Sequence, residues 1–293
     1  MDKFNLSFKK AWFYFFIVKV LYMFVALFIY AKFTTLGDTP GYLNGRYYDF
    51  SLILTSSNYL LGTFGTLFSN ILGTTLANIP FLLLSFYGIY YPINKINLSN
   101  KHLSILLILL SLPSFGIWTS ICSKESVSVF FMGIILGYII DMLNNKSMKI
   151  ELIHLIAIYL MFLIKPQYAI AVFSLIILIK LLSRKNMSVY NKFFIFIIYI
   201  LGIGIVFFVL RDLIDQLSHV MPHHFISVAG NATRENIYIV EQYDVFFNAP
   251  YNMFLAFWGP TYSEVIQKPI NGLVFMESLF ILFLFIYFIY IFL

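Results

Sequence analysis

Asp38 is the first residue of the chain whose type and setting could do chemistry. It follows a long apolar stretch and stands in a turn made by Gly37, Pro40 and Gly41. A carboxylate beside an apolar, low-dielectric region can serve as a general base or ligate a metal ion. Asp38 is therefore the candidate catalytic residue, and the alternative is an ordinary solvated aspartate in a turn.

A second candidate group follows a proline inside an apolar stretch. Pro113 is followed by small polar residues within 114–120 and then by Lys124 and Glu125. Polar groups at membrane depth need protein partners or a water-filled cavity. Lys124 could therefore bind an anion while Glu125 orients it, or the two side chains could simply pair with each other.

Two more cations stand where apolar stretches end. Lys165 belongs to a Lys165-Pro166 turn, and Arg211 immediately precedes Asp212. Each has an ordinary explanation, since a lysine stem can lie along apolar surface and Arg211 can form an ion pair at a helix end. Together, Lys124, Lys165 and Arg211 offer the charge-assisted donors that a phosphate or pyrophosphate needs.

The residues assigned to substrate or phosphate binding lie at the ends of apolar stretches or in two long segments between the predicted spans, 33–73 and 211–270. Tyrosines of the first segment could stack on a sugar or form hydrogen bonds with it. The assigned residues are Tyr42, Arg46, Asp49, Lys124, Glu125, Lys165, Arg211 and Arg234.

The composition shows what kind of molecule must position these groups. The 293 residues are 61% hydrophobic and only 11% charged, with a mean hydropathy of +0.88. Soluble domains are about one quarter charged, so the composition excludes a soluble domain and predicts an all-α polytopic membrane protein. The net charge of +6 is not a nucleic-acid signal in such a chain. The single cysteine, Cys122, excludes an internal disulfide and a cysteine-cluster metal site.

About 20 apolar residues are needed for a helix to cross the hydrocarbon core of a membrane. Eight stretches are candidate spans by this measure, although two of them are short. They are 11–32, 74–93, 102–121, 126–143, 150–164, 166–183, 193–210 and 271–293.

Charge sets the orientation of these spans. With the N-terminus in the cytoplasm, the inner face carries 11 basic and three acidic residues, and the outer face carries seven basic and nine acidic residues. The same rule puts the uncharged stretch 51–72 on the outer surface as an amphipathic helix, with a re-entrant or spanning segment as the alternative. Residues 248–260 read as a second outer amphipathic helix. The whole chain, 1–293, is then one integral membrane domain, and it stops inside its last apolar stretch, as a chain truncated at the C-terminus would.

Residues 35–42, residues 113–126 and the Lys165 turn together resemble a known group of proteins. They are similar to bacterial polytopic membrane proteins of surface-polysaccharide gene clusters, which resemble glycosyltransferases of the C-type membrane fold. Many of those proteins are labelled oligosaccharide-repeat polymerases. These motifs cover under a sixth of the chain, whereas the general layout covers nearly all of it.

The resemblance implies an acidic residue in the first outer loop that activates or positions the acceptor hydroxyl, and Asp38 matches that place. It also implies a donor sugar linked to a polyprenyl phosphate or pyrophosphate, for which Lys124, Lys165 and Arg211 would bind the phosphate. No Asp-X-Asp pair accompanies Asp38. No metal ligand is therefore assigned, and a divalent cation stays open as a cofactor.

The expected function is transfer of a sugar or oligosaccharide at the outer face of a bacterial cytoplasmic membrane, in the synthesis of a capsule or O-antigen type of polysaccharide. The alternatives are a flippase or transporter of the lipid-linked glycan and a non-catalytic membrane component of the same pathway. A transporter needs polar residues deep in the bundle, where the sequence offers Lys19 and Glu277. The expected partners are the lipid-linked glycan and membrane lipid, with no nucleic acid, and the sequence is silent on the oligomeric state.

Overall fold

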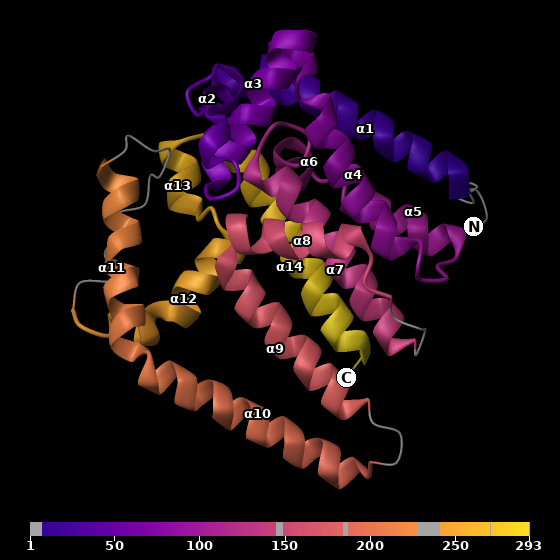
Figure 1. Ribbon diagram of the computed structural model, residues 1–293, viewed down its shortest axis with the longest axis vertical. Coiled ribbons are helices and arrows are strands. Elements are labelled where there is room, and N and C mark those ends of the chain that lie inside the picture. Colours follow the sequence, from indigo (N-terminus) through magenta and orange to yellow (C-terminus); the bar gives the residue numbers. More distant parts are fainter. Residues whose placement is uncertain (1–7, 145–148, 184–186, 228–240, 270, 293) are drawn as a thin grey trace. The chain divides into compact units, whose positions relative to one another are not determined.

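The computed structural model describes residues 8–144, 149–183, 187–227, 241–269 and 271–292, and every regular element in these ranges is a helix (Figure 1). The predicted all-α class is confirmed for this part of the chain. The chain divides into two compact units, residues 1–184 and 185–293.

The first unit contains two short 3-10 helices, η1 and η2, among its α-helices. Its elements are α1 (Phe8–Phe28), η1 (Tyr30–Lys32), α2 (Thr39–Leu43), η2 (Phe50–Leu52), α3 (Ser57–Leu76), α4 (Ile79–Ile93), α5 (Asn100–Leu109), α6 (Pro113–Trp118), α7 (Lys124–Leu143), α8 (Leu152–Ile164) and α9 (Pro166–Leu182). The second unit has α10 (Val189–Val209), α11 (Arg211–Ser227), α12 (Asp244–Trp258), α13 (Tyr262–Gln267) and α14 (Asn271–Phe292).

Among the described residues, four helices are long and apolar enough to cross a membrane. They are α1 extended through η1, α7, α10 and α14. The pair α3 and α4 passes the same test together, but the two helices are bent by 91° at their junction, as in a broken span or a re-entrant loop. The length and composition of these helices therefore suggest a membrane-associated protein.

Each of the eight predicted stretches contains a helix, but several of these helices are shorter than predicted. The stretch 102–121 is two helices, α5 and α6, and α8 and α9 have 13 and 17 residues. Pro113 and Pro166 each stand at the first position of a helix. A proline has no N–H for the preceding turn, so it ends one helix and begins the next. At 1.5 Å per residue, α8 is only about 20 Å long.

The predicted amphipathic stretch 51–72 is helical from Ser57 onward, and its helix α3 ends at the sharp bend before α4. Gly73 has a φ of +78° inside α3, a backbone conformation that favours glycine. The Asn78 side chain then donates to the carbonyls of Thr74 and Thr75, at 3.0 and 3.1 Å. The bond to Thr74 satisfies one of the last carbonyls of α3, which the end of a helix would otherwise leave without a partner, and the Thr75 carbonyl also accepts from the backbone amide of Asn78.

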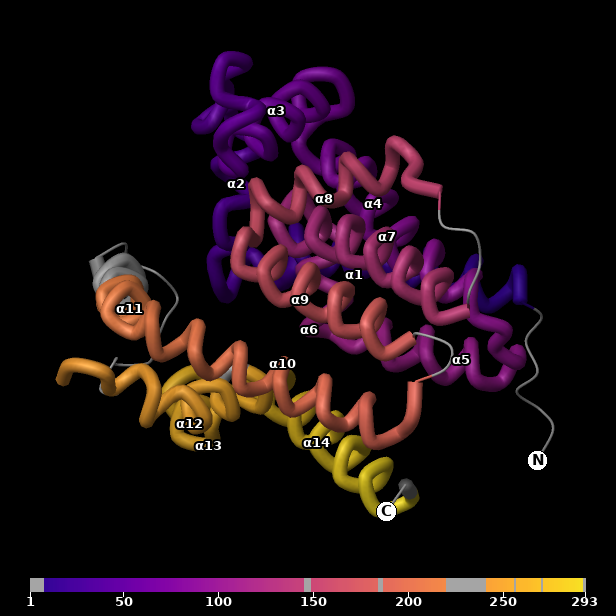
Figure 2. The backbone as a smooth tube through the Cα atoms, turned by 60° about the horizontal axis from the view of Figure 1, so that its bottom comes forward, coloured from indigo at the N-terminus to yellow at the C-terminus, as the bar shows by residue number. Residues whose placement is uncertain are grey.

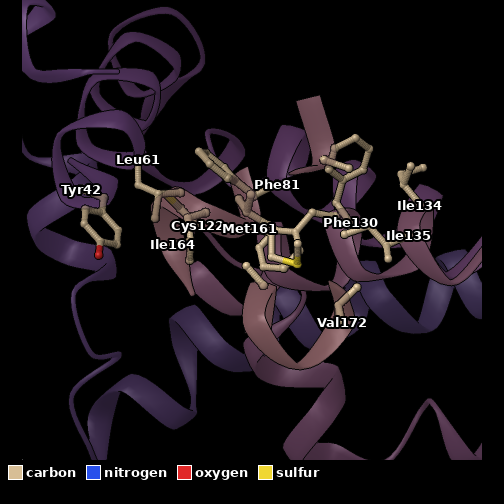
Figure 3. Packing of buried hydrophobic residues seen from close by; sticks show 14 of the residues in the cluster. Tyr42, Leu61, Phe81, Cys122, Phe130, Ile134, Ile135, Met161, Ile164 and Val172 are labelled. Carbon is tan, nitrogen blue, oxygen red and sulfur yellow. The ribbon is translucent and has the colours of Figure 1, made fainter. Parts of the chain in front are cut away.

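The core of the first unit forms where α4 crosses α7 and α7 packs on α8 (Figure 2). Buried side chains extend from Tyr42 and Leu61 past Cys122 to Met161 and Val172 (Figure 3). Small residues allow the α4–α7 crossing to be close. A Cβ placed on Gly133 would lie only 1.7 Å from the carbonyl oxygen of Gly88. The backbones are therefore in direct contact at this crossing.

One end of the α4–α7 pair carries a half-buried ion pair. Lys95, just past α4, binds Asp141 near the end of α7, and its ammonium lies 4.4 Å from the centroid of the Tyr91 ring. The sequence assigns both charges to the cytoplasmic face. The helix packing thus brings together groups that the predicted orientation puts on one side.

Breaking this ion pair should destabilise the protein in a pH-dependent way. Burial lowers the pKa of Lys95, but the hydrogen bonds and the charge interactions with Asp141 and Tyr91 together raise it more, so it ends above its ordinary value of 10.5. The pair therefore stabilises the fold fully below the unfolded pKa, and this contribution is lost as pH rises through the higher folded pKa. Asp141→Asn should lower the free energy of unfolding by about 1 kcal/mol at neutral pH. Unfolding titrations should show this gap shrinking at strongly alkaline pH, and a constant gap would contradict it.

The second unit exposes apolar surface along much of its length. No residue of α10 is buried, although its 21 residues are largely Phe, Ile, Val and Leu. In α14, Ser278 donates to the carbonyl of Gly259, 3.0 Å away. A helix that is apolar on all sides is stable when lipid or other protein surrounds it.

Candidate functional site

The first unit contains a cleft that brings together two of the predicted site residues. Its volume is about 380 Å³, and its walls come from α6, α7 and the start of α9. Glu125 and Lys165 both line it, although 40 residues of sequence separate them. The other lining residues are Ser114, Phe115, Trp118, Thr119, Ser128, Val129 and Tyr168.

Local sequence explains why Glu125 and Lys165 stand at the cleft. Ser123 caps α7, because its hydroxyl accepts from the Ser126 amide at 3.1 Å, so Glu125 falls in the first turn. Lys165 is the residue between α8 and α9, with φ −141° and ψ 68°. The following proline keeps this residue out of the helical conformation. Both side chains are thus attached to helix ends, which hold them more firmly than loops would.

The wall of the cleft at Thr119 is supported from inside the protein by Lys19. The Lys19 side chain is only 1% exposed, and its Nζ donates to the carbonyl oxygen and the hydroxyl of Thr119, at 3.0 and 2.8 Å. Ser85 donates to the same carbonyl. The transporter hypothesis uses Lys19 as a polar group deep in the bundle. In the structure, Lys19 holds Thr119 in position.

The turn at 119–123, which joins α6 to α7, is held by buried side chains. Asn78 is fully buried, and its side-chain oxygen accepts from the Cys122 amide at 2.8 Å. Thr39 donates to the Cys122 carbonyl at 2.8 Å. Burial raises the pKa of the Cys122 thiol. The backbone beside the cleft therefore has specific partners on α4 and on the Asp38 turn.

Removing the Asn78 side chain should loosen this turn. Asn78→Ala leaves the buried Cys122 amide without its acceptor and removes two donors from the end of α3, so unfolding free energy should fall by about 2 kcal/mol. Thermal unfolding of purified protein measures this loss. Asn100→Ala, at an exposed position in the first turn of α5, is the control and should change stability by less than about 0.5 kcal/mol. Equal effects of the two variants would contradict the role of Asn78.

Asp38 lies outside the residues that line the cleft, in a polar group of its own. Its side chain is exposed, and the Tyr42 hydroxyl lies 3.2 Å from its Oδ2 and 3.1 Å from Oδ1 of Asn58. The ring of Tyr42 is only 1% exposed and lies at one edge of the apolar cluster (Figure 3). Burial, followed by the charge of Asp38, raises the pKa of Tyr42. The tyrosine therefore stays protonated, and its one O–H proton is shared between the Asp38 carboxylate and the Asn58 oxygen.

The Asp38 turn and the cleft share a wall. A Cβ placed on Gly37, which has a φ of +57°, would lie 3.8 Å from Cζ3 of Trp118, and Trp118 lines the cleft. On the other side of Asp38, Thr39 is bonded to Cys122. The residues on both sides of Asp38 thus contact the segment 118–122, which carries the cleft wall.

Glycines of α3 hold the segment that follows Asp38. A Cβ on Gly62 would lie 2.4 Å from Cβ of Tyr47, and one on Gly65 would lie 2.7 Å from the Tyr42 carbonyl. The Thr66 hydroxyl donates to that carbonyl at 3.1 Å. The close approach of α3 fixes the backbone of Tyr42, whose hydroxyl binds Asp38.

The other assigned residues of the first unit have individual settings. Arg46 is exposed, with its guanidinium 5.2 Å from the centroid of the Tyr47 ring. Asp49 caps η2, because its Oδ1 accepts from the hydroxyl and amide of Ser51, and these two hydrogen bonds lower the pKa of Asp49. Lys124 is half-buried at the start of α7 and does not belong to the cleft lining.

Arg211 belongs to the second unit, where it lies beside aromatic rings. Its guanidinium lies 4.6 Å from the ring centroid of Phe208 and 5.9 Å from that of Tyr243. Its Nε is 3.8 Å from Asp212, so the helix-end ion pair weighed as the ordinary explanation is present. Arg234 lies outside the described residues. That Arg211 binds the donor phosphate together with Lys124 and Lys165 stays a prediction.

Several residues of the site were not identified as site residues by sequence reasoning. Ser128 follows Glu125 by three positions, so helical spacing could have put it on the same face. Tyr168 follows the Lys165 turn in the same way. Asn58 and Lys19 approach Tyr42 and Thr119 only through tertiary packing, and no sequence spacing signals these contacts.

The described residues contain no group of three or more His, Cys, Asp or Glu side chains placed to hold a metal ion. Comparison with known proteins adds no relative. No protein-family model matches the chain, and neither a curated protein nor a solved structure matches it. The cleft and the Asp38 turn are therefore the features of the molecule that indicate its function.

Proposed function

We propose that this chain transfers a sugar or oligosaccharide from a donor linked to a polyprenyl phosphate or pyrophosphate. In this proposal it is a multi-pass protein of a bacterial cytoplasmic membrane, with about eight spans and a cytoplasmic N-terminus. In this proposal α4, α8, α9 and the pair α5 and α6 complete the bundle, and α3 lies on the outer surface. The reaction takes place at the outer face, and the product is a capsule or O-antigen type of polysaccharide. As part of this proposal, the fold of the chain is similar to that of glycosyltransferases of the C-type membrane fold.

The cleft is the observation that carries this proposal. It combines one amine and one carboxylate, Lys165 and Glu125, with serine and threonine hydroxyls and with the rings of Trp118 and Tyr168. A sugar has apolar ring faces and hydroxyl edges, so aromatic rings and polar side chains suit it. Lys165 supplies a charge-assisted donor for a phosphate at the same place.

The chemistry assigns a separate part to each charged group. Asp38, oriented by the Tyr42 hydroxyl, accepts the proton of the acceptor hydroxyl as that oxygen forms its bond to the sugar carbon. The bond from the same carbon to the phosphate oxygen breaks, and the phosphate leaves with the negative charge. Lys165 stabilises this charge as it develops. Glu125 orients Lys165 or a hydroxyl of the bound glycan.

Complementation of a strain that lacks the gene tests this proposal. Wild type and Lys165→Gln are compared at equal membrane expression, with polymer length resolved on gels and lipid-linked intermediates assigned to one membrane face. Loss of a charge-assisted hydrogen bond should lower polymer synthesis about 10- to 100-fold. Lys101→Gln, at an exposed lysine at the start of α5, is the matched control and should make normal polymer.

The intermediates distinguish the alternatives. Accumulation of lipid-linked glycan on the outer face supports transfer at the cleft. Accumulation on the inner face would overturn the transferase proposal in favour of a flippase or transporter. Normal polymer from Lys165→Gln would show that the cleft takes no part in the transfer reaction.

A further inference from the structure

A second cavity lies among α7, α8 and α9, away from the cleft. Its volume is about 180 Å³, and its floor includes Ile135, Met161 and Val172, which are buried in the apolar core (Figure 3). Its lining also includes Ile150 and Leu155, which are exposed. The cavity therefore reaches from the core to the surface of the first unit.

The walls of this cavity offer hydrocarbon to an occupant. Nine of the ten lining residues are Ile, Leu, Met, Val, Phe or Tyr, and the tenth is His154. Both nitrogens of His154 already have protein partners. Nδ1 accepts from the Glu151 amide at 3.1 Å, and Nε2 lies 3.2 Å from the Tyr91 hydroxyl. A cavity lined almost entirely by hydrocarbon does not hold water well, and it takes apolar molecules instead.

The site is separate from the candidate catalytic cleft. His154 stands near the start of α8, and Lys165 follows the end of the same helix. Eleven residues separate them, which is about 16 Å along a helix axis. In the proposed orientation this end of α8 faces the cytoplasm.

Charged residues next to the cavity lining in sequence indicate the class of the occupant. Lys149 is exposed and precedes Ile150 of the lining, while the Glu151 carboxylate after Ile150 accepts from a backbone amide in the first turn of α8. Lysines at the cytoplasmic membrane surface attract anionic lipid headgroups. A molecule with a hydrocarbon chain for the cavity and a negative charge for Lys149 fits both features.

We propose that the cavity binds one acyl chain of an anionic phospholipid, with the lipid phosphate next to Lys149. The binding requires only that the chain lies in a membrane, as proposed above, and is independent of sugar transfer. Lipid in this site would fill the gap between α8 and α9 and brace the helices that hold Lys165.

Native mass spectrometry of the full-length protein tests this site. The protein is released from nanodiscs of equal phosphatidylglycerol and phosphatidylcholine, and retained lipids are identified by mass. Wild type should keep one phosphatidylglycerol. Val172→Phe and Ile158→Phe, which fill the cavity from two helices, should each lower retention at least tenfold. Ile170→Phe, at an exposed position on α9 outside the lining, should retain lipid as wild type does.

The charge of Lys149 is tested by Lys149→Gln. This variant should keep a lipid but prefer phosphatidylglycerol about fivefold less, the factor that corresponds to about 1 kcal/mol for one cation near an anionic surface. Lys101→Gln should keep the wild-type preference. The proposal fails if the two filling variants remain monodisperse and retain lipid, if the retained molecule is an isoprenoid, or if wild type retains no lipid.

Discussion

Asp38→Asn should lower polymer synthesis by about 100-fold or more, while the stability of the protein changes by less than about 0.5 kcal/mol. The Asp38 side chain is exposed, so the substitution leaves no buried group without a partner. Asparagine can still accept from the Tyr42 hydroxyl, but it cannot accept a proton from the sugar hydroxyl. Loss of the base is therefore separated from loss of the fold.

The measurement is the rate of polymer formation by membranes with matched amounts of protein. Lys32→Gln is the control, since Lys32 is an exposed charge in the segment before Asp38. Tyr42→Phe keeps the buried ring and removes the hydroxyl that orients Asp38, so its rate should fall between those of wild type and Asp38→Asn. Full-length polymer at the normal rate from Asp38→Asn would remove Asp38 from the mechanism.

Gly133→Ala should destabilise the protein by about 3 kcal/mol, the upper end of the usual cost of overpacking. Alanine normally favours a helix by up to about 1 kcal/mol over glycine, but here its methyl group would meet the Gly88 carbonyl of α4 at 1.7 Å. The obstacle is backbone rather than a flexible side chain, so α4 and α7 would have to move apart. That movement would also disturb the Lys95–Asp141 pair.

Gly202→Ala is the matched control for this prediction. Gly202 lies inside α10, and a Cβ placed there meets nothing within 4 Å. This variant should be neutral or more stable by up to about 1 kcal/mol. Thermal unfolding of the two purified variants in the same detergent measures the difference. A Gly133→Ala protein as stable as wild type would show that α4 and α7 do not cross as closely as described.

The sequence predicted where helices would form, because long apolar runs determine that directly. It predicted their lengths less well at Pro113 and Pro166, where proline divides apolar runs into shorter helices. Asn78 lies at the 91° bend between α3 and α4, and its partners include Cys122 on a distant turn. No local pattern signals such a contact.

The same division holds for the site. Glu125, Lys165, Asp38 and Tyr42 could be selected by residue type and by their place at the ends of apolar runs. Which of them would share a cleft could not be predicted, because the packing of α6, α7 and α9 decides it. The links from Lys19 to Thr119 and from Asn58 to Tyr42 are likewise products of tertiary packing.

The buried position of Cys122 makes the natural sequence suitable for chemical mapping of membrane sidedness. Its thiol is the only one in the chain, is fully buried and has a raised pKa, so water-soluble maleimides should leave the native protein unlabelled. One cysteine introduced at exposed Ser51 and another at exposed Lys101, in separate proteins, would each be the sole reactive group. In intact cells, an impermeant reagent would then mark the Ser51→Cys protein and spare Lys101→Cys if the two positions lie on opposite sides of the membrane.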